Sequence, residues 1–233
     1  MSEEISLKKI KEICIRPGYH LCWFRKLSFY VTIPLLYLKI RPTQVTVASI
    51  ILGFLAAILF FQGTYLLSII AAIVLCISTL LDHIDGNIAR FQKVTSDKDY
   101  FLDETYNIYG VPIIISMIGL GGYKITGDWI WILVGALATY GFLVREALTQ
   151  LIYVKELKGK KDAKNILAIG ATISKKSLII NKIFPSHYDH FCYGILVFSW
   201  FNKTYLVLLY FAIVYNLLWI GKVAYNYLFA LKK

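Results

Sequence analysis

The chain alternates between long apolar blocks and short polar segments, and most of the apolar blocks have the length of a membrane span. A helix needs about 20 apolar residues to cross a bilayer, and several blocks approach that length. We therefore predict an all-α integral membrane protein with six transmembrane helices. The expected spans cover residues 45–61, 65–81, 100–120, 129–153, 188–201 and 205–227. We expect the second to run on past residue 81 and the fifth, which is short, to begin earlier.

The N-terminal segment, residues 1–41, carries eight Lys or Arg residues but no apolar run long enough to span. Apolar residues recur at helical spacing from Trp23 to Val31, with Arg25 and Lys26 between them. This pattern is typical of a helix that lies in the membrane interface with its basic side toward anionic lipid. An ordinary packing helix is the alternative. Pro34 is expected to end or kink the helix.

Residues 42–233 contain all six expected spans and form the transmembrane catalytic domain in this interpretation. The segment opens with Pro42, which the first turn of a helix accommodates easily, and Thr43 is a candidate N-cap. A chain of 233 residues has room for one or two domains, which agrees with this division.

The positive charge of the chain follows the expected topology. The net charge is +11, yet 22 Lys and Arg residues fall on one side of the six spans and only Lys124 and Lys203 on the other. By the positive-inside rule the basic side, which includes both termini, is cytoplasmic. The charge therefore indicates topology and lipid contact rather than binding of nucleic acid.

Composition bounds the class of protein further. Apolar residues make up 58% of the chain and charged residues only 17%, which excludes an ordinary soluble basic protein. The four cysteines form no CxxC pair, so we expect structural thiols rather than zinc ligands or disulfides. The polar N-terminus lacks an early apolar region, so we expect no cleaved signal peptide.

Residues 82–107, DHIDGNIARFQKVTSDKDYFLDETYN, hold the most informative polar positions. One turn of helix separates Asp103 from Asn107, and Asp99 lies one turn before Asp103. Carboxylates at membrane depth are costly and mark functional sites. The alternative is that these acids pair with Arg90 and Lys93 and merely hold two helices together. At about 100° per residue, the first helix gathers on one face Asp82, Asp85, Gly86, Ala89 and, at its edge, Arg90.

This segment resembles the signature of the CDP-alcohol phosphotransferases, D-x2-D-G-x2-A-R-x8-G-x3-D-x3-D. Two fixed positions depart, because Asp99 stands at the family's glycine and Asn107 at its last aspartate. The start of the first span is also similar to the family's P-N-x-x-T motif, with Thr43 in place of asparagine. The positions that match at the right spacing are Asp82, Asp85, Gly86, Ala89, Arg90 and Asp103.

The resemblance implies a metal-dependent enzyme. The family's aspartates at the positions of Asp82, Asp85 and Asp103 hold the metals, expected here to be two Mg²⁺ or Mn²⁺ ions. Carboxylate oxygens are ligands of the kind that both metals prefer. Two cations bridging the diphosphate of a CDP-linked donor would neutralise its charge and orient the phosphorus for displacement.

Other motif positions would contact the donor. Gly86 and Ala89 would let the nucleotide approach the helix closely, and Arg90 would bind phosphate. Thr46 and Ser96 are lesser candidates for polar contacts to the donor. For these two hydroxyls, helix capping is the alternative.

The family's last aspartate is proposed to take the proton from the acceptor hydroxyl. Asn107 cannot do this, because a carboxamide accepts no proton near neutral pH, although its carbonyl oxygen can still reach a metal. General-base help is worth about 10²- to 10⁴-fold, so its loss would slow transfer without abolishing it. Two neighbours are candidate replacements: Glu104, adjacent to Asn107 on the helix surface, and Asp99, on the face of Asp103. Asp99 could equally crowd the donor.

The resemblance implies a homodimeric transferase of phospholipid biosynthesis, which moves a phospho-alcohol or phosphatidyl group from a CDP-linked donor to a hydroxyl acceptor and releases CMP. A second interpretation, motivated by Asn107 and Asp99, is a member with reduced turnover that binds nucleotide or lipid. An asparagine engineered at position 107 to trap an active enzyme would give the same sequence. The third interpretation is a small transporter, since intramembrane acids also mark ion pathways. The DGxxAR spacing argues against a transporter.

Three further polar groups have two interpretations each. Arg145 and Glu146, late in the fourth span, either line the acceptor cavity or pair structurally. His187, Asp189 and His190 anchor the fifth span at the interface or form a metal site. The Lys-rich residues 155–182 form a solvated or lipid-facing loop, and secondarily a funnel for anionic substrates.

Overall fold

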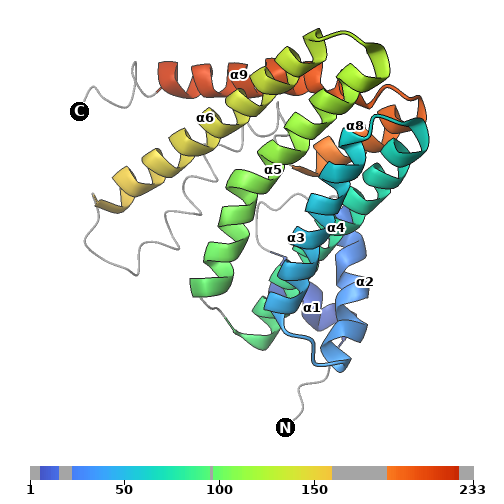
Figure 1. Cartoon of the computed structure of the whole chain (residues 1–233). Helices are drawn as coiled ribbons and strands as arrows, with labels where there is room; N and C mark the ends of the chain where they lie inside the picture. The colour runs from blue at the N-terminus through green and yellow to red at the C-terminus, as the bar shows by residue number, and fades with distance from the viewer. Residues whose placement is uncertain (1–5, 16–22, 95–96, 159–187, 226–233) are drawn as a thin grey trace.

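The computed structural model describes residues 6–15, 23–94, 97–158 and 188–225, and these residues fold into helices without a β-strand (Figure 1). Apolar stretches fold this way because, within a bilayer, a helix satisfies all its backbone N–H and C=O groups internally. The predicted all-α class is confirmed. In chain order the helices are α1 (Leu7–Cys14), α2 (Trp23–Tyr37), α3 (Pro42–Phe61), α4 (Tyr65–Gln92), α5 (Asp97–Thr126), α6 (Ile130–Lys158), α8 (Tyr188–Trp200), the 3₁₀ helix η2 (Thr204–Leu206) and α9 (Val207–Tyr225).

Five stretches of the described chain are long and apolar enough to cross a membrane, in α3, α4, α5, α6 and in η2 with α9. They coincide with five of the predicted spans, and α4 continues past residue 81 to Gln92 as expected. α8 is shorter, with Phe191–Trp200 as its apolar part. The expectation that this span begins earlier falls on residues 159–187, outside the described residues, so the sixth span stays a prediction.

The helix predicted from Trp23 is α2, which packs against α4. It does not end at Pro34, as one of our two expectations for that residue had it, but continues to Tyr37. A proline removes one helical hydrogen bond, and burial of Thr32 and Leu36 against the rest of the protein offsets that loss. Whether α2 lies in the membrane interface stays a prediction.

The start of α3 differs from the expectation for its N-cap. The cap residue is Arg41 rather than Thr43, and Pro42 is the first helical residue. The backbone N–H of Arg41 donates to the side-chain oxygen of Gln44 at 3.0 Å. A side chain of the first turn thus provides the hydrogen-bond acceptor for the backbone N–H of the cap residue. Pro42 has no N–H to satisfy, which is why it is well placed there.

Small and hydroxyl-bearing residues let α3 and α4 pack closely. The Ser49 hydroxyl donates to the Ser78 carbonyl oxygen at 2.9 Å, and the Ser78 hydroxyl donates to the Ser49 carbonyl oxygen at 2.8 Å. Both serines are buried. Such reciprocal hydrogen bonds and short side chains hold helices together where the apolar surroundings give no hydrophobic driving force.

α5 is held between α3 and α6 by glycines. A Cβ atom on Gly53 of α3 would collide with the hydroxyl of Tyr106 on α5. Gly119 of α5 faces Gly135 of α6, and a Cβ on Gly119 would lie 3.2 Å from the Gly135 Cα. These contacts fix the position of α5, which carries the second half of the motif.

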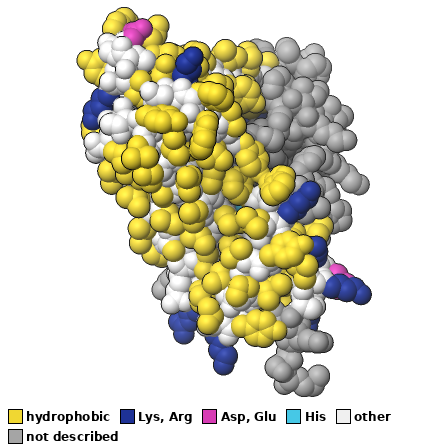
Figure 2. All heavy atoms as spheres, turned by 90° about the vertical axis from the view of Figure 1, so that its right-hand side faces the viewer, with side chains coloured by type: hydrophobic (Ala, Val, Ile, Leu, Met, Phe, Trp, Pro, Cys, Tyr) yellow, Lys and Arg dark blue, Asp and Glu magenta, His cyan; other side chains and the backbone are white. Residues whose placement is uncertain are grey.

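The outer surface agrees with a membrane setting. Figure 2 shows a face on which hydrophobic side chains dominate and Lys and Arg lie mainly near the margins. Large apolar side chains such as Ile51, Leu66 and Ile213 are about two-thirds exposed, at 61%, 66% and 60%. Such a surface is costly in water and suits contact with lipid.

We predict that Gly119→Ala lowers the Tm in detergent. The added methyl group would lie 2.9 Å from the Trp131 carbonyl oxygen and 3.2 Å from the Gly135 Cα, both backbone atoms that cannot rotate away. Overpacking of this kind costs about 1–3 kcal/mol, more than the roughly 1 kcal/mol by which alanine favours a helix over glycine.

Gly221→Ala is the matched control, because a Cβ there meets none of the described atoms within 4 Å. Its Tm is expected to stay equal or rise. An equal or higher Tm for both variants would contradict the close approach of α5 to α6.

Candidate active site

The last turns of α4 and the first turns of α5 bring three aspartates together, and α3 packs against both helices. The side chain of Asp82 on α4 lies within hydrogen-bonding range of Asp103 on α5. Asp85, one turn after Asp82, interacts electrostatically with both. The structure thus places the three motif aspartates side by side, while their role as metal ligands stays a prediction.

Thr46 of α3 also reaches this cluster. Its Oγ1 lies 2.5 Å from the Asp85 Oδ2 and 3.2 Å from the Pro42 carbonyl oxygen. Asp85 is 8% exposed and accepts a further hydrogen bond from the backbone N–H of Gly86. Thr46 is therefore a buried partner of a motif carboxylate rather than a helix cap, and its expected contact with a donor stays a prediction.

Arg90 folds back along α4 toward Gly86 and Asn87. Its Nη2 donates to the Asn87 Oδ1 at 3.2 Å, and a Cβ on Gly86 would lie 3.1 Å from the same Nη2. Gly86 therefore makes room for the guanidinium, and Ala89 is the next small residue on the helix. The Arg90 Nε is buried and has no hydrogen-bond partner among the described residues. An anion at this place would satisfy it.

The alternative that the acids merely pair with basic neighbours has partial support in the described part of the chain, because Arg90 interacts electrostatically with Asp85. There, no ion pair joins Arg90 or Lys93 to a motif aspartate, and the ion pair that is present, Arg145–Glu146, lies on α6. Both interpretations of the acids, a functional site and pairing between helices, stay predictions.

A cavity of about 180 Å³ opens next to Asp103. The Asn107 side-chain amide donates to the Asp103 Oδ1 at 3.5 Å and also lines the cavity. Glu104, one turn before, accepts a hydrogen bond from the Gln150 side chain on α6. The complete lining is Glu104, Asn107, Val111, Phe142, Arg145, Glu146 and Tyr215.

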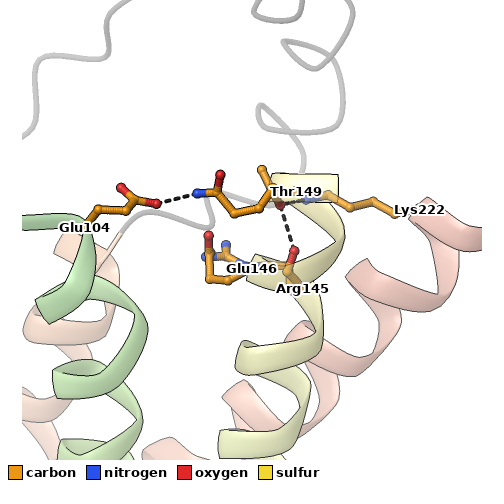
Figure 3. A network of polar contacts seen from close by, with 6 residues as sticks. Glu104, Arg145, Glu146, Thr149 and Lys222 are labelled. Atoms are coloured by element: carbon orange, nitrogen blue, oxygen red, sulfur yellow. Dashed lines mark hydrogen bonds and ion pairs between the residues drawn. The ribbon is translucent and has the colours of Figure 1, made fainter. Parts of the chain in front are cut away.

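Figure 3 shows a network of polar contacts on α5, α6 and α9, which includes Glu104, Arg145 and Glu146 of the cavity lining. Arg145 pairs with Glu146 and lies 5.2 Å from the ring centres of both Phe142 and Tyr215. The two interpretations of Arg145 and Glu146 therefore hold together, since they form a pair and they line a cavity. A role of this cavity in binding an acceptor stays a prediction.

Three polar residues of this network, Gln150, Thr149 and Lys222, were missed by the sequence reasoning. Lys222 donates to the Thr149 hydroxyl at 2.6 Å, and that hydroxyl donates to the Arg145 carbonyl oxygen at 2.7 Å. The signal was their spacing, because Thr149 and Gln150 each follow a charged residue of α6 by four positions.

The donor set suits divalent cations that a substrate helps to bind. Two carboxylates within hydrogen-bonding range, as at Asp82 and Asp103, need a proton or a cation between them. Across the described residues, however, no group of three or more His, Cys, Asp or Glu side chains is arranged to hold a metal ion by itself. Mg²⁺ is typically bound by one or two carboxylates together with substrate phosphates, so Asp82, Asp85 and Asp103 fit that mode.

Other predicted positions lie outside what the structure describes. Ser96 and His187 are outside the described residues, as is most of the Lys-rich segment 155–182. The side chains of Asp99, Asp189 and His190 are likewise outside them. The expectations for these residues stay predictions.

Two comparisons with known proteins agree with this geometry. The family model described as CDP-alcohol phosphatidyltransferase matches residues 39–231, a range that includes every residue of the aspartate cluster and the cavity. The chain is also similar to the bifunctional IPC transferase and DIPP synthase of Thermococcus kodakarensis, at 30% identity over 159 residues. The match covers 62% of this chain and 35% of that protein, so the chain spans about a third of the relative's length.

The carboxylate contact leads to a prediction about stability. We expect Asp82→Asn to raise the Tm in the presence of a chelator, because it removes one of two like charges in contact. We expect Mg²⁺ or Mn²⁺ to raise the Tm of the wild type but not of Asp82→Asn. A ligand at 100 times its Kd stabilises a folded protein by about 2.7 kcal/mol.

Asp128→Asn provides the control, since Asp128 lies in the exposed connection before α6 and far along the chain from the motif. It should respond to the metals as the wild type does. An equal metal-dependent rise in Asp82→Asn would show that the cations bind elsewhere.

Proposed function

The chain belongs to the CDP-alcohol phosphatidyltransferase family, and from this premise we propose that it transfers a phospho-alcohol or phosphatidyl group from a CDP-linked donor to a hydroxyl acceptor. CMP is the second product. One observation carries the proposal: Asn107 lines the cavity and donates to Asp103 of the carboxylate cluster. A donor diphosphate at the cluster and an alcohol in the cavity would therefore be neighbours.

On the donor side, Asp82, Asp85 and Asp103 hold two Mg²⁺ or Mn²⁺ ions in this proposal. When bound, the cations neutralise diphosphate charge and favour displacement at phosphorus. Arg90 binds a donor phosphate through guanidinium N–H groups, a role that its buried, unpartnered Nε supports. Thr46 keeps Asp85 in place from α3.

The small residues and Ser96 complete the donor site in this proposal. Gly86 and Ala89 have a small side chain or none, so the nucleotide can approach the backbone of α4 closely. Ser96 supplies a polar contact to the donor.

On the acceptor side, the alcohol occupies the cavity beside Glu104. Its volume is about 180 Å³ and charged and polar side chains form part of its lining, so it suits a polar alcohol. Glu104 takes the hydroxyl proton, because it is the carboxylate that lines the cavity next to Asn107. Asn107 orients the acceptor with its amide.

The step balances as a displacement at phosphorus. The acceptor oxygen forms a bond to the phosphorus that carries the donor alcohol, and its proton passes to Glu104. The bond between that phosphorus and the bridging oxygen of the diphosphate breaks. CMP leaves with the electron pair of the broken bond. The similar protein from Thermococcus kodakarensis is named as a transferase and a synthase, which agrees with a group transfer.

The setting of this reaction is also part of the proposal. The site faces the cytoplasm together with both termini, an orientation supported by 22 basic residues on one side of six spans and two on the other. A water-soluble nucleotide would reach the site from that side. A homodimer is the expected assembly.

A second candidate function rests on one observation. Asn107 stands where the family has an aspartate, and its amide donates to Asp103 instead of accepting a proton. The alternative is a member that binds CMP or CDP-linked lipid without efficient turnover.

A CMP-release assay with CDP-alcohols, Mg²⁺ and candidate acceptors separates the two. Under the proposed function, the wild type releases CMP, Asp82→Ala abolishes release, and Glu104→Gln lowers kcat about 10²- to 10⁴-fold, the usual worth of a general base. Glu146→Gln is the matched control, since Glu146 lines the same cavity but is paired with Arg145.

The Asn107→Asp variant decides between the transferase and the member that binds without efficient turnover. If the wild type binds CMP without turnover and Asn107→Asp restores release, the second candidate function is correct. If neither protein binds CMP or releases it, both are wrong, and ion flux in vesicles would then point to transport.

A further inference from the structure

Asn87 lies inside the motif, between Gly86 and Arg90, at a position the family signature leaves open. Its side chain is fully buried, at 0% exposed. The amide Nδ2 lies 2.9 Å from the Ser28 Oγ and 3.3 Å from the Thr32 Oγ1, both on α2. Its Oδ1 accepts from the Arg90 Nη2 at 3.2 Å. Asn87 thus joins α2 to the arginine of the motif.

The hydroxyl protons of α2 fix which way the Asn87 amide points. Ser28 donates to the Arg25 carbonyl oxygen at 2.9 Å, and Thr32 donates to the Ser28 carbonyl oxygen at 2.7 Å. Each hydroxyl has one proton, so both can only accept from Asn87. The amide nitrogen must therefore face α2, and the amide oxygen must face Arg90.

This orientation suits Arg90, which has donors and no acceptor. A reversed amide would place an NH₂ group against the guanidinium and leave the two hydroxyls without a donor, which is costly for buried groups. The guanidinium of Arg90 also packs against the backbone of Gly86. A Cβ atom on Gly86 would lie 3.1 Å from Nη2 and 3.4 Å from Nη1. Arg90 is therefore confined from two sides.

We propose that Asn87 is a positioning residue for Arg90, and that Ser28 and Thr32 set its orientation from outside the site. This inference rests on the proposed function in one respect, that Arg90 binds a donor phosphate. α2 then does more than cover α4. It holds the Arg90 guanidinium in the geometry that a donor phosphate needs. Because the side chain is already ordered, donor binding costs less conformational entropy.

The experiment measures CMP binding by calorimetry and the KM for the CDP-linked donor. We expect Asn87→Leu to raise the Kd for CMP and the KM for the donor about 10- to 100-fold, in line with the loss of a hydrogen bond to a charged group. The KM for the acceptor should stay unchanged. Thr32→Val, which keeps the shape of Thr32 and never contacts the nucleotide, should weaken CMP binding several-fold.

Asn216→Leu is the matched control. Asn216 also joins two helices, since its amide donates to the Leu137 and Ala212 carbonyl oxygens on α6 and α9. Its loss should lower the Tm without changing donor affinity. If Asn87→Leu lowers only the Tm and binds CMP as the wild type does, Asn87 is merely structural and the inference is wrong. If the wild type itself binds no CMP, the proposed function and this inference both fail.

A second, independent observation concerns the N-terminal helices. A cavity of about 240 Å³ lies between α1 and α2 and is lined by Lys11, Ile15, Lys26, Phe29 and Tyr30. Two cations thus border a mostly apolar hollow, and Lys11 Nζ lies 5.7 Å from the centre of the Tyr30 ring.

The exposed face of α2 continues this hollow as an apolar surface. Trp23, Leu27, Tyr30 and Tyr37 recur at helical spacing and are 76%, 45%, 55% and 65% exposed. The opposite face of α2 is buried and holds Ser28 and Thr32. A helix with an exposed apolar face and basic residues beside it is suited to the surface of an anionic membrane.

We infer that this cavity binds the headgroup of an anionic membrane lipid, with the phosphate between Lys11 and Lys26 and the acyl chains along the apolar face of α2. Charge complementarity selects an anionic lipid over a zwitterionic one. Each lysine near an anionic membrane surface favours binding roughly 5-fold, so two lysines favour it about 25-fold.

Native mass spectrometry of the purified protein, titrated with phosphatidylglycerol or phosphatidylcholine, tests this site. We expect the wild type to prefer phosphatidylglycerol and Lys11→Ala/Lys26→Ala to lose that preference. Lys8→Ala/Arg41→Ala removes the same charge from exposed positions of the same segment and should keep it. An equal loss in both double variants would show general attraction rather than a site, and competition by inorganic phosphate would show an anion site rather than a lipid site.

Discussion

Asp82 of α4 and Asp103 of α5 place two carboxylates within hydrogen-bonding range among apolar helices. Like charges in contact repel, and the repulsion grows where water is scarce. The neighbouring structure limits this cost, because Thr46 donates to Asp85 from α3 and the Gly86 N–H donates to it from α4. Costly carboxylates of this kind mark functional sites, which agrees with membership of the CDP-alcohol phosphatidyltransferase family.

The geometry of the site depends on helices that carry none of its motif. α3 packs against both α4 and α5, and Gly53 of α3 lets Tyr106 of α5 approach closely. From the other side, α2 holds Asn87 and through it Arg90. A site built on packed helices keeps its groups in place, because each rotamer is limited by its neighbours.

The cavity side has a different character from the aspartate side. There Glu104, Arg145 and Glu146 come from two helices and are tied by Gln150 and by the paired charges. Acids and bases are mixed, whereas the motif cluster is acidic. This difference agrees with the two kinds of ligand that we propose, a metal-bound diphosphate on one side and a polar alcohol on the other.

Sequence alone predicts the all-α membrane class, five of the expected spans and the motif on α4 and α5, because span length and motif spacing are local properties of the chain. The N-cap of α3 is Arg41 rather than the expected Thr43, and α2 continues past Pro34 to Tyr37, while a kink at Pro34 stays a prediction. Only the tertiary structure brought Thr46 to Asp85, Asn87 to the α2 hydroxyls and Glu104 to the cavity beside Asn107. The physical reason is that these contacts join helices up to 59 residues apart in sequence, and which faces meet follows from close packing around glycines and serines rather than from periodicity along one helix.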